Sequence, residues 1–319
     1  MDNDTDMRIL AVDDEPVFLD ILEQHLVTLG FTGVVYCESA EDALATLDLG
    51  QQEFDCFLVD IKMPGMDGIE LCRRIRRRPA CQSTPILMLT AMSESNYIDA
   101  AFLAGASDYI TKPIKKVELS ARLRSARELG RERSRVAALT STLKGQGASQ
   151  PALQFSDAVR LHDLEGAVDY VALKNYALTL GNLRMLNWQA VGFHVSGASQ
   201  FLAATSPAEY LEMMQDVGSV LFDILKLGRV MISHAGSGNF VALIGRERGY
   251  DRDETQATAN ALLEPFNDYY RTVCPVRIGV IAGEARRNAL LSFQPADRSI
   301  EQALSSALIR AANVGLTAG

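Results

Sequence analysis

The feature that most constrains the fold is an alternation of short apolar runs with amphipathic stretches from Arg8 to about Ala126. Runs such as "RILAV" and "DCFLVD" are apolar, and the stretches between them, such as "PVFLDILEQHLVTLG", repeat apolar residues at helical spacing. Strands that are apolar on both faces need helices on both sides of their sheet. The pattern therefore predicts an α/β unit with a doubly wound parallel sheet.

Length and composition limit the class of protein. At 319 residues the chain exceeds one ordinary domain, so we expect two domains, each with its own core. The apolar runs are all shorter than the roughly 20 residues of a membrane helix, and the start "MDNDTDMR" is acidic, unlike a secretory signal. The five cysteines are scattered, which favours reduced thiols and no zinc site. We expect a cytoplasmic protein without a membrane partner.

The formal net charge of the chain is -9. A negative protein repels the phosphate backbone of DNA and RNA. In addition, no helix-turn-helix pattern with a basic recognition helix follows the first half of the chain. We therefore expect no nucleic-acid partner.

Polar residues follow four of the apolar runs in the first half: Asp13 and Asp14, Asp60, Thr90 and Lys112. The carboxyl ends of parallel strands meet at one edge of a sheet, where ligands bind. Three carboxylates so close together repel one another unless a hard cation lies between them, and Mg²⁺ prefers oxygen ligands. A lysine and a hydroxyl beside that cation can bind a phosphoryl group. The sequence predicts a magnesium-dependent phosphoryl site.

The motifs "VDDEP", "LVDIKMPGMDG", "LTA" and "KP" occur in that order and closely resemble the CheY-like receiver domain of two-component response regulators. The resemblance implies a flavodoxin-like fold for the first domain. It also implies that Asp60 is the phosphoacceptor and that a histidine kinase or a phosphotransfer protein is the phosphoryl donor.

The same resemblance assigns the other residues of this site. It implies that Mg²⁺ is held by Asp13, Asp14, Asp60 and the backbone carbonyl of Lys62. Thr90 and Lys112 would contact the phosphoryl group, and Tyr109 would be an aromatic switch. The peptide bond between Lys112 and Pro113 would be cis. Each of these positions carries the expected residue.

A basic segment follows, with apolar residues at heptad-like spacing: Leu119, Ala126, Leu129, Val136 and Leu143. Several seam positions are polar, and a glycine within the segment costs about 1 kcal/mol relative to alanine. We predict a long helix that pairs weakly in a homodimer, either constitutive or formed on phosphorylation. We divide the chain into a receiver domain (1–126), a helical linker (127–150) and an output domain (151–319).

The second half reads as a helix from Leu153 to about Leu183, then strand, helix, two strands joined by a turn, helix, strand and a last helix. Without its first helix, the order strand, helix, strand, strand, helix, strand is the ferredoxin-like α+β order. The turn between the two central strands contains Gly236, Ser237, Gly238 and Asn239. Two glycines in a hairpin turn could let a phosphate approach the backbone.

The order of elements, the run "NFVALI" after the turn and the ending "ALIRAANVG" resemble the GGDEF domain of diguanylate cyclases, a nucleotidyl-cyclase-type fold. The resemblance is weaker here. Where that family has Gly-Gly-Asp/Glu-Glu-Phe, this chain has the sequence Gly236-Ser237-Gly238-Asn239-Phe240.

The other motif positions of the GGDEF family also differ. The metal-binding Asp-x-Asp aligns with His194-Val195-Ser196, and the phosphate-binding lysine aligns with Ala312. The inhibitory Arg-x-x-Asp is missing from residues 227–230. Each lost metal removes several kcal/mol of transition-state stabilisation, so the loss of two would slow the reaction by many powers of ten. We expect a degenerate output domain with no catalytic residue and no organic cofactor.

We expect this output domain to signal by contact with a downstream protein or by dimerisation. Three alternatives remain: an active diguanylate cyclase, a module that senses GTP or cyclic di-GMP through Gly236 and Gly238, and a metal pair formed by His194 and His234. The glycines have a simpler explanation as well, because they supply the positive φ that a tight turn needs.

Overall fold

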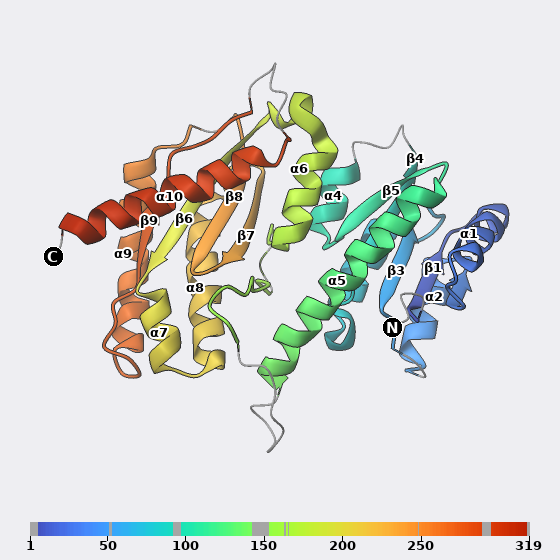
Figure 1. Ribbon diagram of the computed structural model, residues 1–319, viewed down its shortest axis with the longest axis horizontal. Helices are drawn as coiled ribbons and strands as arrows, with labels where there is room; N and C mark the ends of the chain where they lie inside the picture. Colours follow the sequence, from blue (N-terminus) through green and yellow to red (C-terminus); the bar gives the residue numbers. More distant parts are fainter. Residues whose placement is uncertain are drawn as a thin grey trace. The chain divides into compact units, whose positions relative to one another are not determined.

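The computed structural model (Figure 1) describes residues 6–50, 53–91, 97–141, 153–162, 164, 166–247, 249–288 and 295–317. The chain divides into two compact units, Met1–Ala138 and Leu139–Gly319. Within the described ranges, no helix combines the length and the apolar character needed to cross a membrane.

The first unit is built on a five-stranded parallel sheet with the order β2-β1-β3-β4-β5. This is the flavodoxin-like, doubly wound order, and it confirms the predicted fold of the first domain. The strands are β1 (Arg8–Val12), β2 (Gly33–Cys37), β3 (Cys56–Asp60), β4 (Ile86–Ala91) and β5 (Asp108–Lys112).

Alternate residues of the same strand enter two different cores. Leu10 and Val12 of β1 belong to one apolar cluster, whereas Ile9 and Ala11 belong to the other. Both faces of the sheet are therefore covered, as the apolar runs predicted. The covering helices are α1 (Pro16–Thr28), α2 (Ala40–Asp48), α3 (Gly68–Arg76), α4 (Ile98–Leu103) and α5 (Lys116–Ser141), with a short 3₁₀ turn η1 (Pro79–Cys81).

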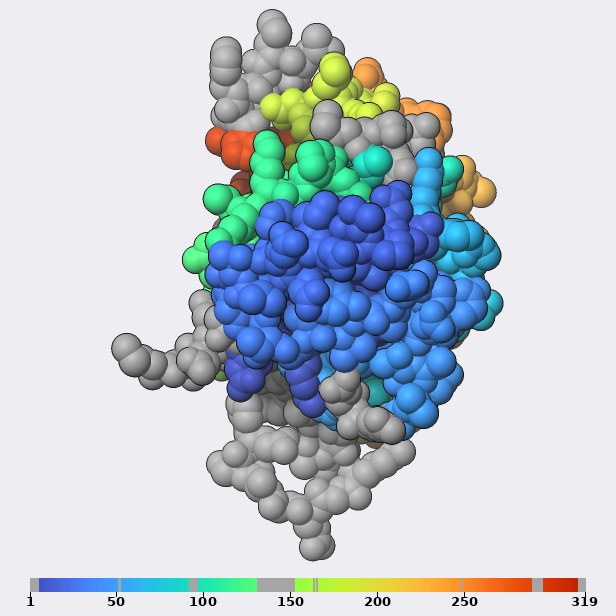
Figure 2. All heavy atoms as spheres, turned by 90° about the vertical axis from the view of Figure 1, so that its right-hand side faces the viewer, coloured from blue at the N-terminus to red at the C-terminus, as the bar shows by residue number. Residues whose placement is uncertain are grey.

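Local signals fix the starts of two of these helices. The Ser39 hydroxyl accepts a hydrogen bond from the backbone N–H of Asp42 at the start of α2, and the Asp67 carboxylate accepts one from Glu70 at the start of α3. The face of this unit that Figure 2 shows in blue includes α1 and α2.

Helix α5 is continuous from Lys116 to Ser141, so it runs through the predicted boundary at residue 126. The compact first unit ends at Ala138. An added Cβ at Gly130 would lie 3.2 Å from Pro85, so this glycine lets the helix pass close to the receiver core. The side chains of the predicted seam residues Val136 and Leu143 are not among those that the structure describes.

The second unit contains a four-stranded antiparallel sheet with the order β7-β8-β6-β9. Its strands are β6 (Trp188–Ser196), β7 (Val230–Gly236), β8 (Asn239–Gly245) and β9 (Gly279–Ala282). Strand β9 is shorter than the predicted run "VRIGVIAG". The side chain of Asn267 bonds both the N–H and the C=O of Ile278, which withdraws these groups from the sheet ladder.

Helices cover both faces of this sheet. Trp188 contacts Tyr176 on one face, where Gly192 also lies against the backbone of Ala303, and on the other face Phe240 lies beside Gly218. The helices are α6 (Tyr170–Met185), α7 (Ala198–Ala204), α8 (Pro207–Leu225), α9 (Arg252–Tyr270) and α10 (Arg298–Thr317). A capping box between Ser206 and Glu209 starts α8.

The helix predicted from Leu153 is wrong in its start, because α6 begins only at Tyr170. Residues 153–162, which we call the strap, run instead along the rest of this unit. The N–H of Val159 donates to His234 Nδ1 across 2.9 Å, and the N–H and C=O of His162 pair with the Gln215 side chain. Backbone groups satisfied in this way need no helical ladder.

Candidate functional site

The polar residues predicted to converge lie at or directly after the carboxyl ends of parallel strands in one sheet, the sheet drawn in Figure 1. Asp13 directly follows β1, Asp60 ends β3, Thr90 lies near the end of β4, and Lys112 ends β5. Strands β1 and β3 are neighbours, while β2 lies on the far side of β1. The edge is therefore a topological switch point, which is where ligands bind in open α/β sheets.

Lys112 joins the two most buried carboxylates of this edge. Its Nζ lies 2.7 Å from Asp13 Oδ2 and 2.5 Å from Asp60 Oδ1. Asp13 is 0% exposed and Asp60 is 5% exposed. The peptide bond between Lys112 and Pro113 is cis, as the resemblance predicted. The predicted lysine therefore contacts both acids directly.

Backbone groups hold the second oxygen of each carboxylate. The N–H of Lys62 donates to Asp60 Oδ2 across 2.7 Å, and the N–H of Glu15 donates to Asp13 Oδ1 across 3.1 Å. Each acid is thus fixed by one backbone donor and one ammonium group. This arrangement fixes the direction of the Asp60 carboxylate, which a nucleophile requires.

Burial raises the pKa of Asp60 to about 6, and the neighbouring Asp13 carboxylate adds to this effect, while Lys112 opposes it. Burial also raises the pKa of Asp13. For Lys112, burial lowers the pKa, but hydrogen bonds to Asp13 and Asp60 outweigh it, so the pKa is raised. Asp60 is therefore mainly ionised above pH 6 and remains paired with a charged lysine.

The other predicted residues lie near this cluster in different environments. Thr90 is buried, and its hydroxyl donates to the carbonyl of Ala91 across 3.2 Å. Asp14 is half-buried beside Asp13. Tyr109 is half-buried and packs against one of the two apolar clusters.

The donor chemistry of the site suits a hard cation. The carboxylates of Asp13 and Asp60 both contact the Lys112 ammonium group. Each offers oxygen ligands of the kind that Mg²⁺ prefers. Among the residues that the structure describes, no three His, Cys, Asp or Glu side chains converge closely enough to hold a metal by themselves. The fit therefore rests on two converging carboxylates, with Asp14 and the Lys62 carbonyl next to them in sequence.

Three residues of this site were missed from the sequence. Lys112 Nζ lies 3.9 Å from the centre of the Phe18 ring, and Lys62 Nζ lies 5.6 Å from the centre of the Tyr97 ring. An added Cβ at Gly68 would lie 1.8 Å from the Asp60 carbonyl oxygen, so only glycine fits there. The glycine-rich run "PGMDG" was a signal for Gly68, whereas nothing in the sequence singled out the two aromatic residues.

A cavity of about 390 Å³ borders the phosphoacceptor candidate. Its lining includes Lys62, whose backbone N–H binds Asp60, and Tyr97, which lies over the Lys62 ammonium group. The complete lining is Ile61, Lys62, Met63, Pro64, Asp67 and Tyr97. The neighbourhood of Asp60 thus has room for another group.

The hairpin turn of the second unit is covered by the strap. The N–H of Ser237 donates to the carbonyl of Phe155 across 2.6 Å. An added Cβ at Gly236 would lie 2.2 Å from the carbonyl oxygen of Ser156, and one at Gly238 would lie 3.4 Å from the Phe155 ring. The backbone at Gly236, Ser237 and Gly238 has positive φ. Both glycines therefore serve a left-handed turn, and Gly236 also permits close packing against the strap.

Two further residues of this hairpin have internal partners. Asn239 donates from Nδ2 to the Gly236 carbonyl across 3.1 Å, and its Oδ1 lies 2.9 Å from His194 Nδ1. Phe240 is buried, and its ring lies edge-on to the ring of His234. These contacts hold the turn and the two strands together.

His194 and His234 have separate partners. His194 pairs with Asn239 of the neighbouring strand, whereas Nδ1 of the buried His234 accepts from Val159. Burial lowers the pKa of His234 to about 3. These contacts argue against the alternative in which the two rings share a metal ion.

Comparison with known proteins covers the first unit. The family model of the response regulator receiver domain matches residues 9–124. The transcriptional regulatory protein TcrA of Mycobacterium tuberculosis is 40% identical over 124 residues, which are 39% of this chain and 47% of TcrA. ResD of Bacillus subtilis, also a transcriptional regulatory protein, is 37% identical over 126 residues, which are 39% of this chain and 50% of ResD. The chain thus spans about half the length of these curated relatives.

A solved structure is also similar to this chain: the receiver domain of the sensor histidine kinase PA1611 from Pseudomonas aeruginosa, with a magnesium ion coordinated in its active site cleft. The two chains are 30% identical, and the match covers 38% of this chain and 98% of the solved chain, with a TM-score of 0.36. The family match and the sheet order together identify the N-terminal part of this chain, over residues 9–124, as a response regulator receiver domain of two-component signalling.

Proposed function

We propose that the chain is a phosphorylation-dependent response regulator in which Asp60 accepts a phosphoryl group from a histidine kinase or a phosphotransfer protein. The observation that carries this proposal is the pairing of Asp60 and Asp13 with Lys112 at the carboxyl edge of the receiver sheet. The match of residues 9–124 to the receiver family supports it.

The side chains of this edge have distinct roles in the transfer. The Asp60 carboxylate attacks the phosphorus of a phosphohistidine, so that a P–O bond forms while the P–N bond breaks and the histidine leaves. Lys112 balances negative charge on the transferred group, and the Thr90 hydroxyl donates a hydrogen bond to it. The Lys62 N–H holds Asp60 in position throughout.

Mg²⁺ fits the oxygen donors of this edge: Asp13, Asp14, Asp60 and the backbone carbonyl of Lys62. When bound, it would neutralise charge on the phosphoryl group and the surrounding acids. The two buried carboxylates that share Lys112 are the structural support for this assignment.

The signal would leave the site through β5 and α5. Thr90 turns toward the phosphoryl group, and Tyr109 moves into the space that Thr90 vacates. Arg122 of α5 pairs with the buried Asp108 of β5 across 2.7 Å, so this helix is tied to the strand that carries Tyr109 and Lys112. Each tenfold change in the population of the active state requires about 1.4 kcal/mol of differential contacts.

We further propose that the second unit is a degenerate GGDEF-like domain with a ferredoxin-like core and no catalytic activity. The order strand, helices, strand, strand, helix, strand from β6 to β9 supports the fold assignment. The strap supports the loss of nucleotide binding, because the Ser237 N–H that a phosphate would use already bonds Phe155. The output is then contact with a downstream protein or dimerisation.

Two experiments test this function. Beryllofluoride with Mg²⁺ should change the near-ultraviolet spectrum of the full chain in the region where tyrosine absorbs. Asp60→Asn should abolish this change. An equal response in that variant would defeat the Asp60 assignment. Incubation with GTP and Mg²⁺ should give no cyclic di-GMP, and calorimetry should detect no GTP binding. Product formation would establish a cyclase instead, and binding without turnover would establish a nucleotide sensor.

A further inference from the structure

The surface between α8 and α9 is the strongest unassigned feature of the second unit. We propose that it binds a cationic amphipathic helix of a partner protein, with the apolar face of that helix on α9 and its positive flank on α8. This inference rests on the proposal that the second unit signals by protein contact, and it names the docking surface.

An apolar stripe runs along the side of α9 that borders α8. It contains Leu262, Phe266 and Tyr269, spaced by four and three residues, and Val273 follows in the turn after the helix. Leu262 is 46%, Tyr269 58% and Val273 43% exposed, although large apolar side chains are usually covered. Leu262, Phe266 and Tyr269 share one helical face and span about 11 Å of α9. A partner helix of about three turns would cover the stripe.

An acidic ridge borders the stripe on α8. Glu212 and Asp223 are exposed, Asp216 is half-buried between them, and their spacing of four and seven residues places them on one face. The hydroxyl of Tyr270 donates to Asp216, which attaches the C-terminal end of α9 to this ridge. The two helices therefore form one surface, acidic on one side and apolar on the other.

A cavity of about 330 Å³ lies where the C-terminal end of α8 meets the N-terminal end of α9. Among the described residues that line it, three are carboxylates and none is a cation. The lining is Asp223, Ile224, Leu225, Gly249, Tyr250, Asp251, Glu254, Thr255, Thr258 and Leu262. Its apolar residues continue the stripe, and its acids continue the ridge, so the cavity could receive one large side chain of the partner.

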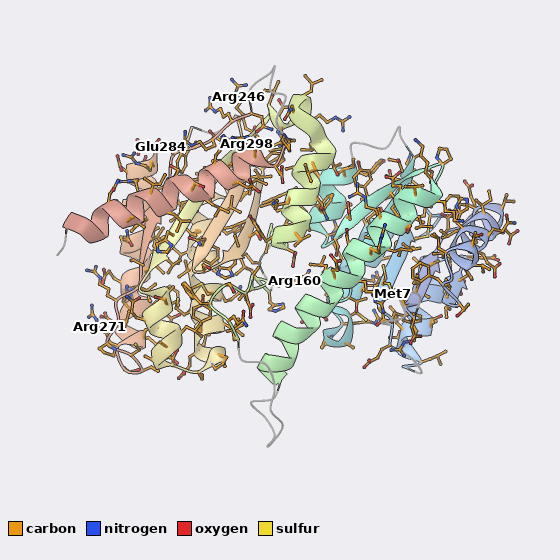
Figure 3. The ribbon with its side chains drawn as sticks, viewed as in Figure 1. Met7, Arg160, Arg246, Arg271, Glu284 and Arg298 are labelled. Atoms are coloured by element: carbon orange, nitrogen blue, oxygen red, sulfur yellow. The ribbon has the colours of Figure 1, made fainter. Side chains whose placement is uncertain are left out.

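Two of the residues labelled in Figure 3, Arg271 and Glu284, mark the two ends of α9. Arg271 directly follows α9, and Glu284 pairs with Arg252, the first residue of α9. Lys226 contacts Asp223 across 2.8 Å, but both side chains are more than half exposed, and a pair of this kind contributes little. A cation on the partner can therefore compete for Asp223.

The chemistry of the surface selects its occupant. Packed helices accept another helix along the groove between them, with anchors at i, i+4 and i+7. The acids of α8 favour Lys or Arg beside those anchors and repel an acidic flank. An anionic lipid surface or a nucleic acid would bring negative charge to this ridge, and both are disfavoured for that reason.

The test uses the full chain and a fluorescent synthetic peptide of about 18 residues. The peptide has Leu at i, i+4, i+7 and i+11, Lys beside this stripe and Gln elsewhere. Anisotropy should report binding that weakens with salt. Leu262→Arg should weaken it about tenfold, and Asp223→Lys should weaken it by a similar factor. Ile309→Arg is the matched control, because Ile309 is 64% exposed on α10, and it should bind like the wild type.

Two control peptides separate this surface from general attraction to a negative protein. A scrambled peptide of the same composition should bind at least tenfold more weakly than the amphipathic one, as should a peptide with Glu in place of Lys. Equal binding of the scrambled peptide, or equal binding by Leu262→Arg and the wild type, would overturn the proposal. Self-association of the full chain that Leu262→Arg abolishes would make a second copy the occupant and would also overturn it.

These outcomes are independent of the proposed function of the chain. Formation of cyclic di-GMP from GTP would defeat the non-catalytic output while leaving the peptide result intact. Loss of the Leu262 dependence would defeat the surface while leaving the role of Asp60 intact. Thermal melting of each variant confirms that it is folded, and the exposed position of Leu262 predicts a melt close to that of the wild type.

Discussion

The backbone N–H of Ser237 donates a 2.6 Å hydrogen bond to the carbonyl of Phe155, so the strap covers the turn of the central hairpin in the second unit. The two glycines of this turn therefore have a structural use that does not involve phosphate. Gly236 in particular combines φ of 84° with a close approach to Ser156.

Gly236→Ala should destabilise the second unit by about 2 to 3 kcal/mol. The new Cβ would lie 2.2 Å from the Ser156 carbonyl oxygen on a backbone with positive φ, so the strap must move. Urea denaturation followed by the fluorescence of Trp188, the single tryptophan, measures this unit. Gly249→Ala is the control, because its added Cβ has no described atom within 4 Å apart from those of its chain neighbours. Equal midpoints for the two variants would show that the packing is not needed.

His234 should make the second unit less stable in mild acid. Its pKa is about 3 in the folded chain, because the ring is buried, and the unfolded value is near 6.5. The folded ring therefore resists the proton that the unfolded ring binds. The contribution of the neutral His234 ring to stability is full above pH 6.5 and is lost as the pH falls from 6.5 toward 3.

At pH 5.5 this loss should amount to about 1.4 kcal/mol relative to pH 7.5. His234→Gln should remove that part of the pH dependence, which urea denaturation of both proteins at the two pH values would measure. If the free energy of unfolding changed equally between the two pH values in both proteins, His234 would not be the cause of the lower stability in acid.

Lys112→Met should destabilise the metal-free first unit by about 3 kcal/mol, because it leaves the buried Asp13 and Asp60 carboxylates without their cation. Added Mg²⁺ should restore part of the loss. Circular dichroism during urea denaturation, with and without Mg²⁺, measures both effects. Arg74→Met is the control, because it breaks only an exposed pair with Glu70, worth at most about 1 kcal/mol. Similar losses of unfolding free energy in Lys112→Met and Arg74→Met would contradict the burial of the Asp13 and Asp60 carboxylates.

Asp60→Asn should stabilise the metal-free first unit at pH 7.5. The folded pKa of Asp60, about 6, exceeds its ordinary value of 3.8, so its contribution to stability is full below pH 3.8 and is lost as the pH rises through 6. The gain on removing the charge should be about 1 to 2 kcal/mol after solvent screening. Denaturation curves at pH 5 and 7.5 should show the larger gain at pH 7.5. A loss of stability at both would be inconsistent with this electrostatic account.

The sequence was most informative where strand geometry alone brings residues together. Asp13 directly follows one parallel strand, and Asp60 and Lys112 end two others, so their convergence follows from the sheet without knowledge of any side-chain packing. Phe18 could not be predicted in the same way. It lies within an ordinary amphipathic helix, and only the folded path of α1 places its ring beside Lys112.

The strap was mispredicted because its partners are distant in sequence. Val159 and His234 are 75 residues apart. The apolar Leu153 and Leu161 are buried, Leu161 beside Gly218 of α8, and this burial fits a helical pattern equally well. The spacing of apolar residues predicts which side chains are buried, but it does not predict the hydrogen-bond partners of the backbone. Tertiary hydrogen bonds therefore decided the structure of this segment.

The central claim is that Asp60 carries the phosphoryl group. The most direct measurement is peptide mapping by mass spectrometry after the full chain reacts with an acyl phosphate and Mg²⁺, with acidic handling to preserve the acyl phosphate. We predict one added phosphoryl group, on the peptide that contains Asp60, and none without Mg²⁺ or in Asp60→Asn. A phosphoryl group on another residue, or an unmodified chain under conditions that label a known receiver domain, would contradict the account.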